Sequence, residues 1–539
     1  MIKATACFAL ATLLGNAVAL PYNTTTSPIV TVGEVKYVGY HNTTLNTHIY
    51  YSIPFAAAPI GPLRWKAPQP YIAPSNYTKT STPIDATKVG PSCVQGTPYS
   101  FLAGAPPPSQ INGSEDCLTL TVWTPDTAIA GAKLQLPVVF NIHGGGYTVG
   151  EAVNPALDPH ALMRHTGNAF IYVSTQYRLG AYGFVGGPKF VSEGGAQNIG
   201  LLDQRAALEW TRKNIAAFGG DPDKVTIFGG SAGGGSVTAQ VAWEGGVEPP
   251  FRAAIAEYPW WQQFLKEDQL DRQFEVLLTD AGCADLKCLQ EIPEDVLKNA
   301  TQKTYTTAYL EGAYGYGTFY YGPYVDGKVV RDLPSREFAA GHFAKVPTIV
   351  SREGYEGWAF SNQSMMTIEE EKNDLRTQFP YADDSFIDKL YALYPSEDFN
   401  STFWHRQTWF GDFSINCPSR YIAASIAATN TPVFKELFDA GTQLHGATGV
   451  FLFDLNYAST PGANATIADS LKDFYLSFAL HLDPNAQSWS NVSKPVWPDY
   501  KSGDVMSFNY TEMGAVSDVY YDNTERCKFW QDNSEVVQN

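Results

Sequence analysis

The 539-residue sequence predicts an α/β protein with a large, mostly parallel sheet that helices cover on both faces. Three short apolar runs rich in β-branched residues support this prediction, at residues 136–142, 169–175 and 225–228. Between the last two runs, four apolar residues recur at helical spacing on one face: Leu201, Leu208, Ile215 and Phe218. Buried strands that alternate with amphipathic helices are typical of such a sheet.

Composition supports a folded protein and argues against polyanionic partners. Hydrophobic residues make up 44% of the chain and charged residues 17%, which suits a large core and excludes a disordered chain. The 36 Lys and Arg against 54 Asp and Glu give a formal net charge of -18. Nucleic acids and anionic membranes bind clustered cations, so we expect neither as a partner.

The N-terminus has the features of a secretory signal peptide. Lys3 precedes an apolar run at 4–14, and Ala17-Val18-Ala19 forms a small-residue cleavage site, which predicts a signal peptide over residues 1–19. The run is shorter than the roughly 20 apolar residues that a membrane span needs. No later stretch reaches that length, so we expect an exported protein without a stable membrane anchor.

Sequons and cysteines also suit export. Ten N-x-S/T sequons occur, at Asn23, Asn42, Asn76, Asn112, Asn299, Asn362, Asn400, Asn464, Asn491 and Asn509. Cys7 would leave with the signal peptide, and an even set remains: Cys93, Cys117, Cys283, Cys288, Cys417 and Cys527. Spacing alone leaves all pairings of the six open. No Cys/His cluster has zinc spacing, so no metal site is predicted.

A candidate nucleophile lies directly after the third apolar run. Residues 229–233 read Gly-Gly-Ser-Ala-Gly, and a helix-compatible run follows at 236–243. Small residues are needed where a sharp strand-to-helix turn crowds the backbone and raises a serine hydroxyl above the sheet edge. The N-terminus of the following helix would face Ser231.

A second glycine motif closes the first apolar run. His143 is followed by Gly144, Gly145 and Gly146, a sequence that can aim backbone N–H groups at a developing oxyanion. Preorganised donors of this kind contribute about 3–4 kcal/mol each in acyl transfer. Neither a P-loop nor a dinucleotide-binding motif accompanies the glycines, so a phosphate-binding loop is not favoured.

Together these motifs make the chain resemble the type B carboxylesterase family, which includes fungal secreted lipases and the cholinesterases. The resemblance covers nearly all of the mature chain, through motifs at residues 61–65, 114–120, 143–146, 198–204, 218–222 and 229–234. It implies an α/β-hydrolase fold that forms a single domain over residues 20–539. It also implies hydrolysis of a small-molecule or lipid ester without a cofactor.

The resemblance assigns roles to residues of this sequence. Ser231 matches the family's nucleophile, and the N–H groups of Gly145, Gly146 and Ala232 match its oxyanion donors. The acid is implied at Glu356, because Glu356-Gly357-Trp358 follows an apolar strand at the family's spacing. Glu353, which also precedes a glycine, is the alternative.

The catalytic base is implied at His445. His445-Gly446 follows a Gly-rich loop between two apolar runs, which is the family's placement. We interpret the other histidines after Ser231 as structural: His342, His405 and His481.

The resemblance also implies structural pairs. Ion pairs are expected for Arg64 with Glu115 and for Arg178 with Asp203. The family's disulfides match Cys93–Cys117 and Cys283–Cys288, and by elimination Cys417–Cys527 could form a third, which departs from the two-bridge fungal pattern.

Substrate size and the fate of the acyl group remain open at this stage. The Cys93–Cys117 segment matches the family's flap, and its Pro-rich stretch at 105–108 favours an esterase over a lipase with a long lid. Aromatic residues crowd 258–261 and 305–324, where they could line a substrate pocket or equally form core. An acyltransferase and a non-catalytic adhesion-type relative are the alternatives. The sequence does not determine the oligomeric state.

Overall fold

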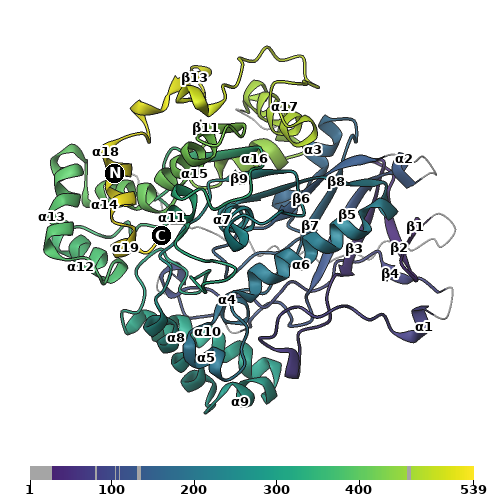
Figure 1. Ribbon diagram of the computed structural model, residues 1–539, viewed down its shortest axis with the longest axis horizontal. Coiled ribbons are helices and arrows are strands. Elements are labelled where there is room, and N and C mark those ends of the chain that lie inside the picture. The colour runs from purple at the N-terminus through teal and green to yellow at the C-terminus, as the bar shows by residue number, and fades with distance from the viewer. Residues whose placement is uncertain (1–26, 79–81, 103–104, 109, 130–134, 458–462) are drawn as a thin grey trace.

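The computed structural model describes residues 27–78, 82–102, 105–108, 110–129, 135–457 and 463–539. The predicted signal peptide and the sequon at Asn23 lie outside these residues. Figure 1 shows one long twisted sheet that crosses the molecule, with helices on both of its faces. The helices α5, α8, α9 and α10 gather at one end of the view, and α12, α13, α14 and α18 at its left.

Within the described residues the sheet has thirteen strands, and its centre is parallel. The order along it is β1-β2-β3-β5-β7-β6-β8-β9-β10-β11-β12-β13, with β4 paired to β2. All pairs from β7 to β12 are parallel, whereas β1, β2, β3, β5 and β7 pair antiparallel, as do β12 and β13. The strands are β1 Ile29–Val32, β2 Val35–Asn42, β3 Thr47–Pro54, β4 Ile84–Ala86, β5 Thr119–Pro125, β6 Leu136–Ile142, β7 Ile171–Thr175, β8 Gly220–Gly230, β9 Ala253–Glu257, β10 Thr348–Glu353, β11 Val433–Asp439, β12 Asp504–Asn509 and β13 Met513–Ser517.

The three predicted strands form the middle of this sheet. The run at 136–142 is β6 along its whole length, the second run begins two residues later than predicted as β7, and the third is the apolar part of a longer β8. The prediction of a large, mostly parallel sheet is therefore confirmed. The antiparallel strands that extend both edges were not identified from the sequence.

Nineteen α-helices are assigned within the described residues. They are α1 Ser75–Thr78, α2 Asp126–Ile129, α3 His160–His165, α4 Gly180–Phe184, α5 Pro188–Ser192, α6 Ile199–Asn214, α7 Ala232–Val241, α8 Glu267–Ala281, α9 Leu286–Glu291, α10 Glu294–Leu310, α11 Pro334–Ala339, α12 Ile368–Gln378, α13 Asp384–Leu393, α14 Thr402–Gly411, α15 Cys417–Ala427, α16 Ala447–Phe453, α17 Ala465–His481, α18 Glu525–Asp532 and α19 Ser534–Val537. Within the described chain, none is both long and apolar enough to cross a bilayer.

Two cores lie on opposite faces of the sheet. Along β6, Val138 and Phe140 belong to one core and Val139 to the other, as the alternation of side chains across a strand requires. Apolar residues of α6 and α7 fill the first core, and those of α3, α16 and α17 fill the second. The predicted stripe Leu201, Leu208, Ile215 and Phe218 is fully buried, although its last two residues lie in a short 3-10 helix after α6.

Three disulfides join segments around the fold. They are Cys93–Cys117, Cys283–Cys288 and Cys417–Cys527, the pairs named from the sequence. The third closes a separation of 110 residues and ties α18 near the C-terminus to α15. Closing a long loop lowers the entropy of the unfolded chain more than closing a short one.

Two buried ion pairs expected from the resemblance are present. Both guanidinium groups make bidentate contacts, Arg64 with Glu115 at 2.6 and 2.9 Å and Arg178 with Asp203 at 2.8 and 2.7 Å. Arg64 also donates to the backbone carbonyl oxygen of Leu289, so this pair links the N-terminal region to α9.

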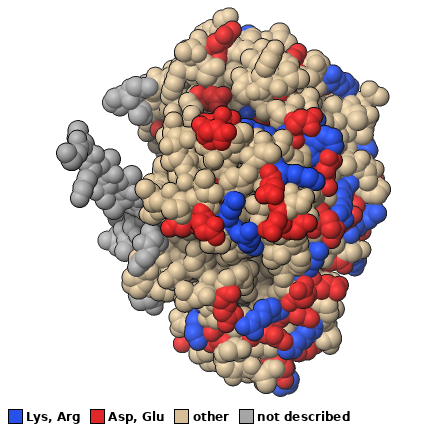
Figure 2. All heavy atoms as spheres, turned by 90° about the vertical axis from the view of Figure 1, so that its left-hand side faces the viewer, with Lys and Arg blue, Asp and Glu red and all other residues tan. Residues whose placement is uncertain are grey.

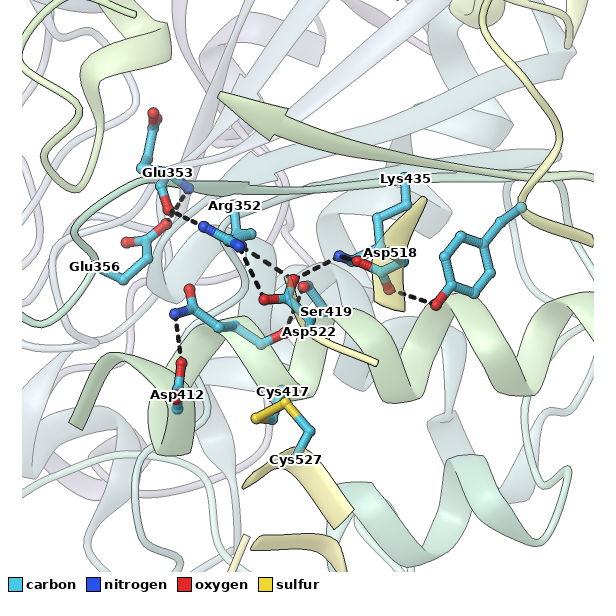
Figure 3. A network of polar contacts seen from close by, with 12 residues as sticks. Arg352, Glu353, Glu356, Asp412, Cys417, Ser419, Lys435, Asp518, Asp522 and Cys527 are labelled. Atoms are coloured by element: carbon cyan, nitrogen blue, oxygen red, sulfur yellow. Dashed lines mark hydrogen bonds and ion pairs between the residues drawn. A yellow bond between two sulfur atoms is a disulfide. The ribbon is translucent and has the colours of Figure 1, made fainter. Parts of the chain in front are cut away.

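A third buried ionic network was not expected from the sequence (Figure 3). The guanidinium of Arg352 on β10 contacts Asp522 at 3.0 and 2.9 Å, and the Lys435 ammonium on β11 contacts Asp522 at 2.6 Å. Lys435 also donates to Asp518, which accepts a further hydrogen bond from the Tyr500 hydroxyl. The network thus links the C-terminal segment to β10 and β11, the two strands that lead towards the candidate site.

The surface carries mixed charge. Figure 2 shows Lys and Arg side chains interspersed with Asp and Glu over the face around α12–α14 and α18. Ion pairs such as Lys266–Glu535 and Arg336–Glu535 occur among the exposed residues. On this face the basic side chains therefore form no continuous patch of the kind that binds a phosphate backbone.

We expect Asp522→Asn to lower the free energy of unfolding by about 3–5 kcal/mol, because it leaves two buried cations with one carboxylate. Urea denaturation measures this change. The matched control is Asp223→Asn, which removes an exposed ion pair with Arg212 at 3.7 Å and should cost about 0–1 kcal/mol. Equal effects of the two substitutions would contradict a stabilising role for the buried network.

Candidate active site

Ser231 occupies a sharp turn between β8 and α7. Its backbone has φ 60° and ψ -126°, a region that residues with a side chain rarely adopt. Its N–H donates to the carbonyl oxygen of Glu257 at 3.1 Å, and its own carbonyl accepts from the N–H groups of Gly235 and Trp260. Ala232 is the first residue of α7. The surrounding backbone therefore maintains a strained conformation that presents the serine at the end of the central strand.

The neighbouring glycines are required by close backbone packing. A Cβ on Gly233 would lie 2.2 Å from the carbonyl oxygen of Ile142, and one on Gly229 would lie 2.8 Å from the same oxygen. Real Cβ atoms do not approach backbone oxygens that closely. The Gly-x-Ser-x-Gly pattern thus reflects the approach of the turn to the end of β6.

The His-Gly-Gly-Gly loop lies directly against this turn. A Cβ on Gly144 would be 3.2 Å from the Cβ of Ser231 and 2.6 Å from the carbonyl oxygen of Gly230. Gly145 has φ 109° and Gly146 has φ 60°, conformations that favour glycine. The two motifs, nearly ninety residues apart in sequence, therefore meet at the carboxyl ends of adjacent strands.

His143 shapes the glycine loop as a neutral imidazole. Burial lowers the pKa of His143 to about 4, and its ring stacks on Tyr177 with 4.4 Å between centroids. Its Nδ1 lies 2.9 Å from the carbonyl oxygen of Gly144, and a neutral ring can donate from this nitrogen. The Tyr177 hydroxyl donates to the carbonyl oxygen of His143 itself.

Glu356 and His445 form a buried pair. Nδ1 of His445 lies 2.5 Å from Oε2 of Glu356, whose side chain is fully buried. The other carboxylate oxygen of Glu356 accepts from the backbone N–H of Glu353 at 2.6 Å. Among the described residues, Nε2 of His445 is buried and has no hydrogen-bond partner. The carboxylate thus orients the imidazole through Nδ1, and Nε2 is available to accept a proton.

Tyr258 places this pair next to the serine turn. Its ring lies 4.9 Å from that of His445, edge to face. Its hydroxyl is the group that a Cβ on Gly230, the residue before Ser231, would meet. The candidate nucleophile, base and acid therefore share one corner of the molecule.

Glu353, the alternative acid, has different partners. Its Oε1 accepts from both the backbone N–H and the hydroxyl of Thr448, at 2.9 and 2.6 Å. Burial, and next the nearby charge of Glu356, raise the pKa of Glu353 well above its usual range. A neutral Glu353 links the turn that carries Glu356 to the start of α16, three residues after His445. The contact with His445 therefore favours Glu356 as the acid.

Two more buried carboxyl groups lie on strands of the sheet near this turn. Glu257 ends β9 and Glu436 lies within β11. Burial raises the pKa of Glu257 well above its usual range and that of Glu436 to about 8, although Glu436 accepts from the Tyr475 hydroxyl at 2.7 Å. Neither residue was predicted from the sequence. No pattern marked them, because Glu257 is the last residue of β9 and β11 also contains Lys435 and Asp439.

Aromatic rings surround His445 and the glycine loop. Phe360 lies 5.0 Å from the His445 ring and 4.5 Å from Trp260, and Trp260 in turn lies 5.4 Å from Phe319. A Cβ on Gly146 would be 2.1 Å from the Phe319 ring. These rings form an apolar wall beside the candidate catalytic groups.

The flap contributes one ring to this wall. Phe101 stacks on Phe319 at 5.1 Å and is 38% exposed, so it lies between the wall and solvent. The prolines at 106–108 are exposed.

Four tyrosines of the 305–324 stretch form core. Ring contacts of 5.4 and 5.0 Å join Tyr305 to Tyr321 and Tyr314 to Tyr320, and all four residues are buried. Trp260 and Phe319 therefore lie beside the candidate catalytic groups, whereas these four tyrosines pack the core.

The three histidines interpreted as structural have partners elsewhere. His342 contacts Glu337 at 3.2 Å, His405 contacts Glu371 at 2.5 Å, and His481 contacts Gln487 at 2.7 Å. None of these partners belongs to the Ser231 turn or to the glycine loop.

The sequence and the fold both match known proteins. The carboxylesterase family profile matches residues 27–530. "Lipase 4" of Diutina rugosa is 32% identical over 87% of this chain and 88% of its own length. "Secreted lipase 1" of Botryotinia fuckeliana is 31% identical (92% and 90% covered), and "Carboxylesterase patB" of Aspergillus clavatus is 28% identical (96% and 98% covered).

Solved structures agree with these relatives. The crystal structure of Aspergillus niger EstA superposes with a TM-score of 0.82 at 25% identity, and the two chains are covered over 96% of this one and 100% of the other. A PNB esterase superposes with a TM-score of 0.75 at 25% identity, over 93% and 99%. The chain belongs to the carboxylesterase family. It has the α/β-hydrolase fold and is a carboxylic ester hydrolase.

We expect Glu356→Gln to lower kcat by about 10³- to 10⁴-fold, because an amide would no longer orient and stabilise the imidazolium. Glu353→Gln keeps a neutral group that can still accept from Thr448, so kcat should stay within about tenfold of wild type. Steady-state hydrolysis of a p-nitrophenyl ester measures both. A large loss with Glu353→Gln alone would make Glu353 the acid.

Proposed function

We propose that the chain is a secreted serine carboxylesterase that uses Ser231, His445 and Glu356 as its triad. The proposal rests chiefly on one observation: a His445 ring held by a buried carboxylate, with its second nitrogen unpaired, next to a strained serine turn. Export through cleavage of residues 1–19 is part of the proposal, and the three disulfides support it.

The first step is acylation of the enzyme. His445 takes the proton of the Ser231 hydroxyl as the oxygen attacks the ester carbonyl. Backbone N–H groups of Gly145, Gly146 and Ala232 then stabilise the oxyanion of the tetrahedral intermediate. Collapse of the intermediate expels the alcohol, which receives its proton from His445.

The second step is hydrolysis of the acyl-enzyme. His445 deprotonates a water molecule, which attacks the acyl carbonyl at the same oxyanion site, and Ser231 leaves with the proton returned by His445. Glu356 stays ionised throughout and stabilises the imidazolium. No step requires a cofactor.

Esters of modest size are the proposed substrates. The short flap, with its exposed prolines and single inserted ring of Phe101, favours an open approach rather than a long amphipathic lid. The relatives named as lipases make a triacylglycerol lipase the second candidate. An acyltransferase would share the first step and differ only in the acceptor, and a non-catalytic adhesion-type protein is disfavoured because all three triad residues are present.

Ser231→Ala should reduce ester hydrolysis by more than about 10⁴-fold, since it removes the nucleophile. Turnover of p-nitrophenyl acetate measures the loss, and circular dichroism checks that the fold is retained. Ser192→Ala, which removes an exposed hydroxyl bonded only to the Lys189 carbonyl, is the matched control and should keep wild-type activity. Substantial activity in Ser231→Ala would refute the proposed mechanism.

For substrate size, we expect kcat/KM to be highest for short acyl chains and to show no jump when the substrate forms micelles. The physical reason is that an open flap exposes the aromatic wall without an interface. A series of p-nitrophenyl esters, assayed below and above micelle formation, measures this, with Ser231→Ala as the blank. Interfacial activation with long-chain esters would instead identify a lipase.

A further inference from the structure

Three potential metal ligands meet at the edge of the sheet that lies away from the active site. His41 on β2 and His48 on β3 are directly opposed across the antiparallel hairpin, and their rings lie 4.7 Å apart. Asp126, the first residue of α2, follows β5, which pairs with β3. The sequence alone does not reveal this group, because His41 and Asp126 are 85 positions apart.

The distances suit one shared ion. Nε2 of His41 lies 2.8 Å from Oδ2 of Asp126, and Nε2 of His48 lies 3.3 Å from its Oδ1. One ligand atom from each residue can be chosen so that all lie within 4.8 Å of one another. Ligands bonded to tetrahedral zinc at about 2.0–2.2 Å are about 3.3–3.5 Å apart, so only small side-chain movements are needed.

The group is incompletely satisfied by the protein alone. Oδ1 of Asp126 and Nδ1 of His48 are buried and form no hydrogen bond with any described residue. The ion pairs of Asp126 within the described chain are with the two histidines, not with Lys or Arg. A buried carboxylate oxygen without a donor costs free energy, and a bound cation would remove that cost.

We propose that His41, His48 and Asp126 form a binding site for a divalent first-row transition-metal ion, with Zn²⁺ as the reference ion and water completing its coordination. Two imidazoles and one carboxylate match the ligand preference of such ions. The side chains of His41 and Asp126 are 29% and 30% exposed, which leaves room for water and for entry of the ion. The bound ion would link the β2–β3 hairpin to the start of α2.

The site is separate from ester hydrolysis. Strand β3 is separated from the Ser231-bearing β8 by β5, β7 and β6. The ion is therefore expected to stabilise the fold rather than to enter the reaction. Failure of this proposal would leave the proposed function untouched, and the reverse also holds.

Isothermal titration of the full-length, untagged, chelator-treated protein with ZnCl₂ tests the proposal. We expect one Zn²⁺ per chain in the wild type, and affinity lowered by about tenfold or more in His41→Asn, His48→Asn and Asp126→Asn. The matched control is His342→Asn, which removes a half-exposed histidine paired with Glu337 and should bind like wild type. Absence of binding to wild type, or unchanged affinity in all three site variants, would overturn the proposal.

Two further measurements distinguish the loss of metal binding from misfolding of a variant. Hydrolysis of p-nitrophenyl acetate should be unchanged in each variant, which establishes that the chain is folded. Co²⁺ added to wild type should give the visible absorption bands of a four-coordinate site, and excess Zn²⁺ should abolish them. A wild-type Co²⁺ spectrum of the hexa-aqua type would contradict the site independently of any substitution.

Discussion

Backbone crowding where β8 meets α7 is the constraint around which the active-site end of the molecule is arranged. The turn brings its own backbone within contact distance of Ile142 and of the glycine loop, which only residues without a Cβ permit. The conformation of Ser231 is held by hydrogen bonds from neighbouring segments rather than by its own preference. The central strands and the segments beside them therefore hold Ser231 in its strained conformation.

The second support of the site is ionic and comes from the far end of the chain. Arg352 immediately precedes Glu353, and its partner Asp522 lies near the disulfide Cys417–Cys527. The turn that carries Glu356, the proposed acid, is therefore connected to β10, β11 and the C-terminal segment (Figure 3). Removal of any one charge from this network would therefore weaken the attachment of the strands that lead to Glu356.

The centre of the fold could be predicted from the sequence because its signals are local. The run at 136–142 consists of apolar and β-branched residues that cannot stay exposed, and it forms β6 without a shift. The edge strands escaped prediction because strands such as β2 and β3 mix polar and apolar residues and contain no continuous apolar run. β8 begins at Gly220 because its polar start pairs with β6, a contact that the apolar pattern does not contain.

The residues of the candidate site also divide into those that a local sequence signal predicts and those that have no such signal. Ser231 and the glycine loop follow from motifs, whereas the choice of Glu356 and His445 came from family resemblance, since the 89 positions between them leave no periodic signal. The geometry agrees with that choice. The substitutions described above test the catalytic roles of Glu356 and His445. Glu257 and Glu436 could not be assigned beforehand, because only tertiary burial distinguishes them from surface acids.

Those buried carboxyl groups keep their protons to a higher pH in the folded chain than in the unfolded chain. Glu436 titrates near pH 8 in the folded chain, whereas in the unfolded chain it would titrate near the ordinary value of 4.5, and Glu257 and Glu353 are shifted in the same direction. Unfolding at neutral pH therefore releases protons. By linkage, this contribution to stability is complete below the unfolded value and fades as pH rises towards 8. Acidic surroundings therefore favour the folded chain, because the buried carboxyl groups keep their protons there.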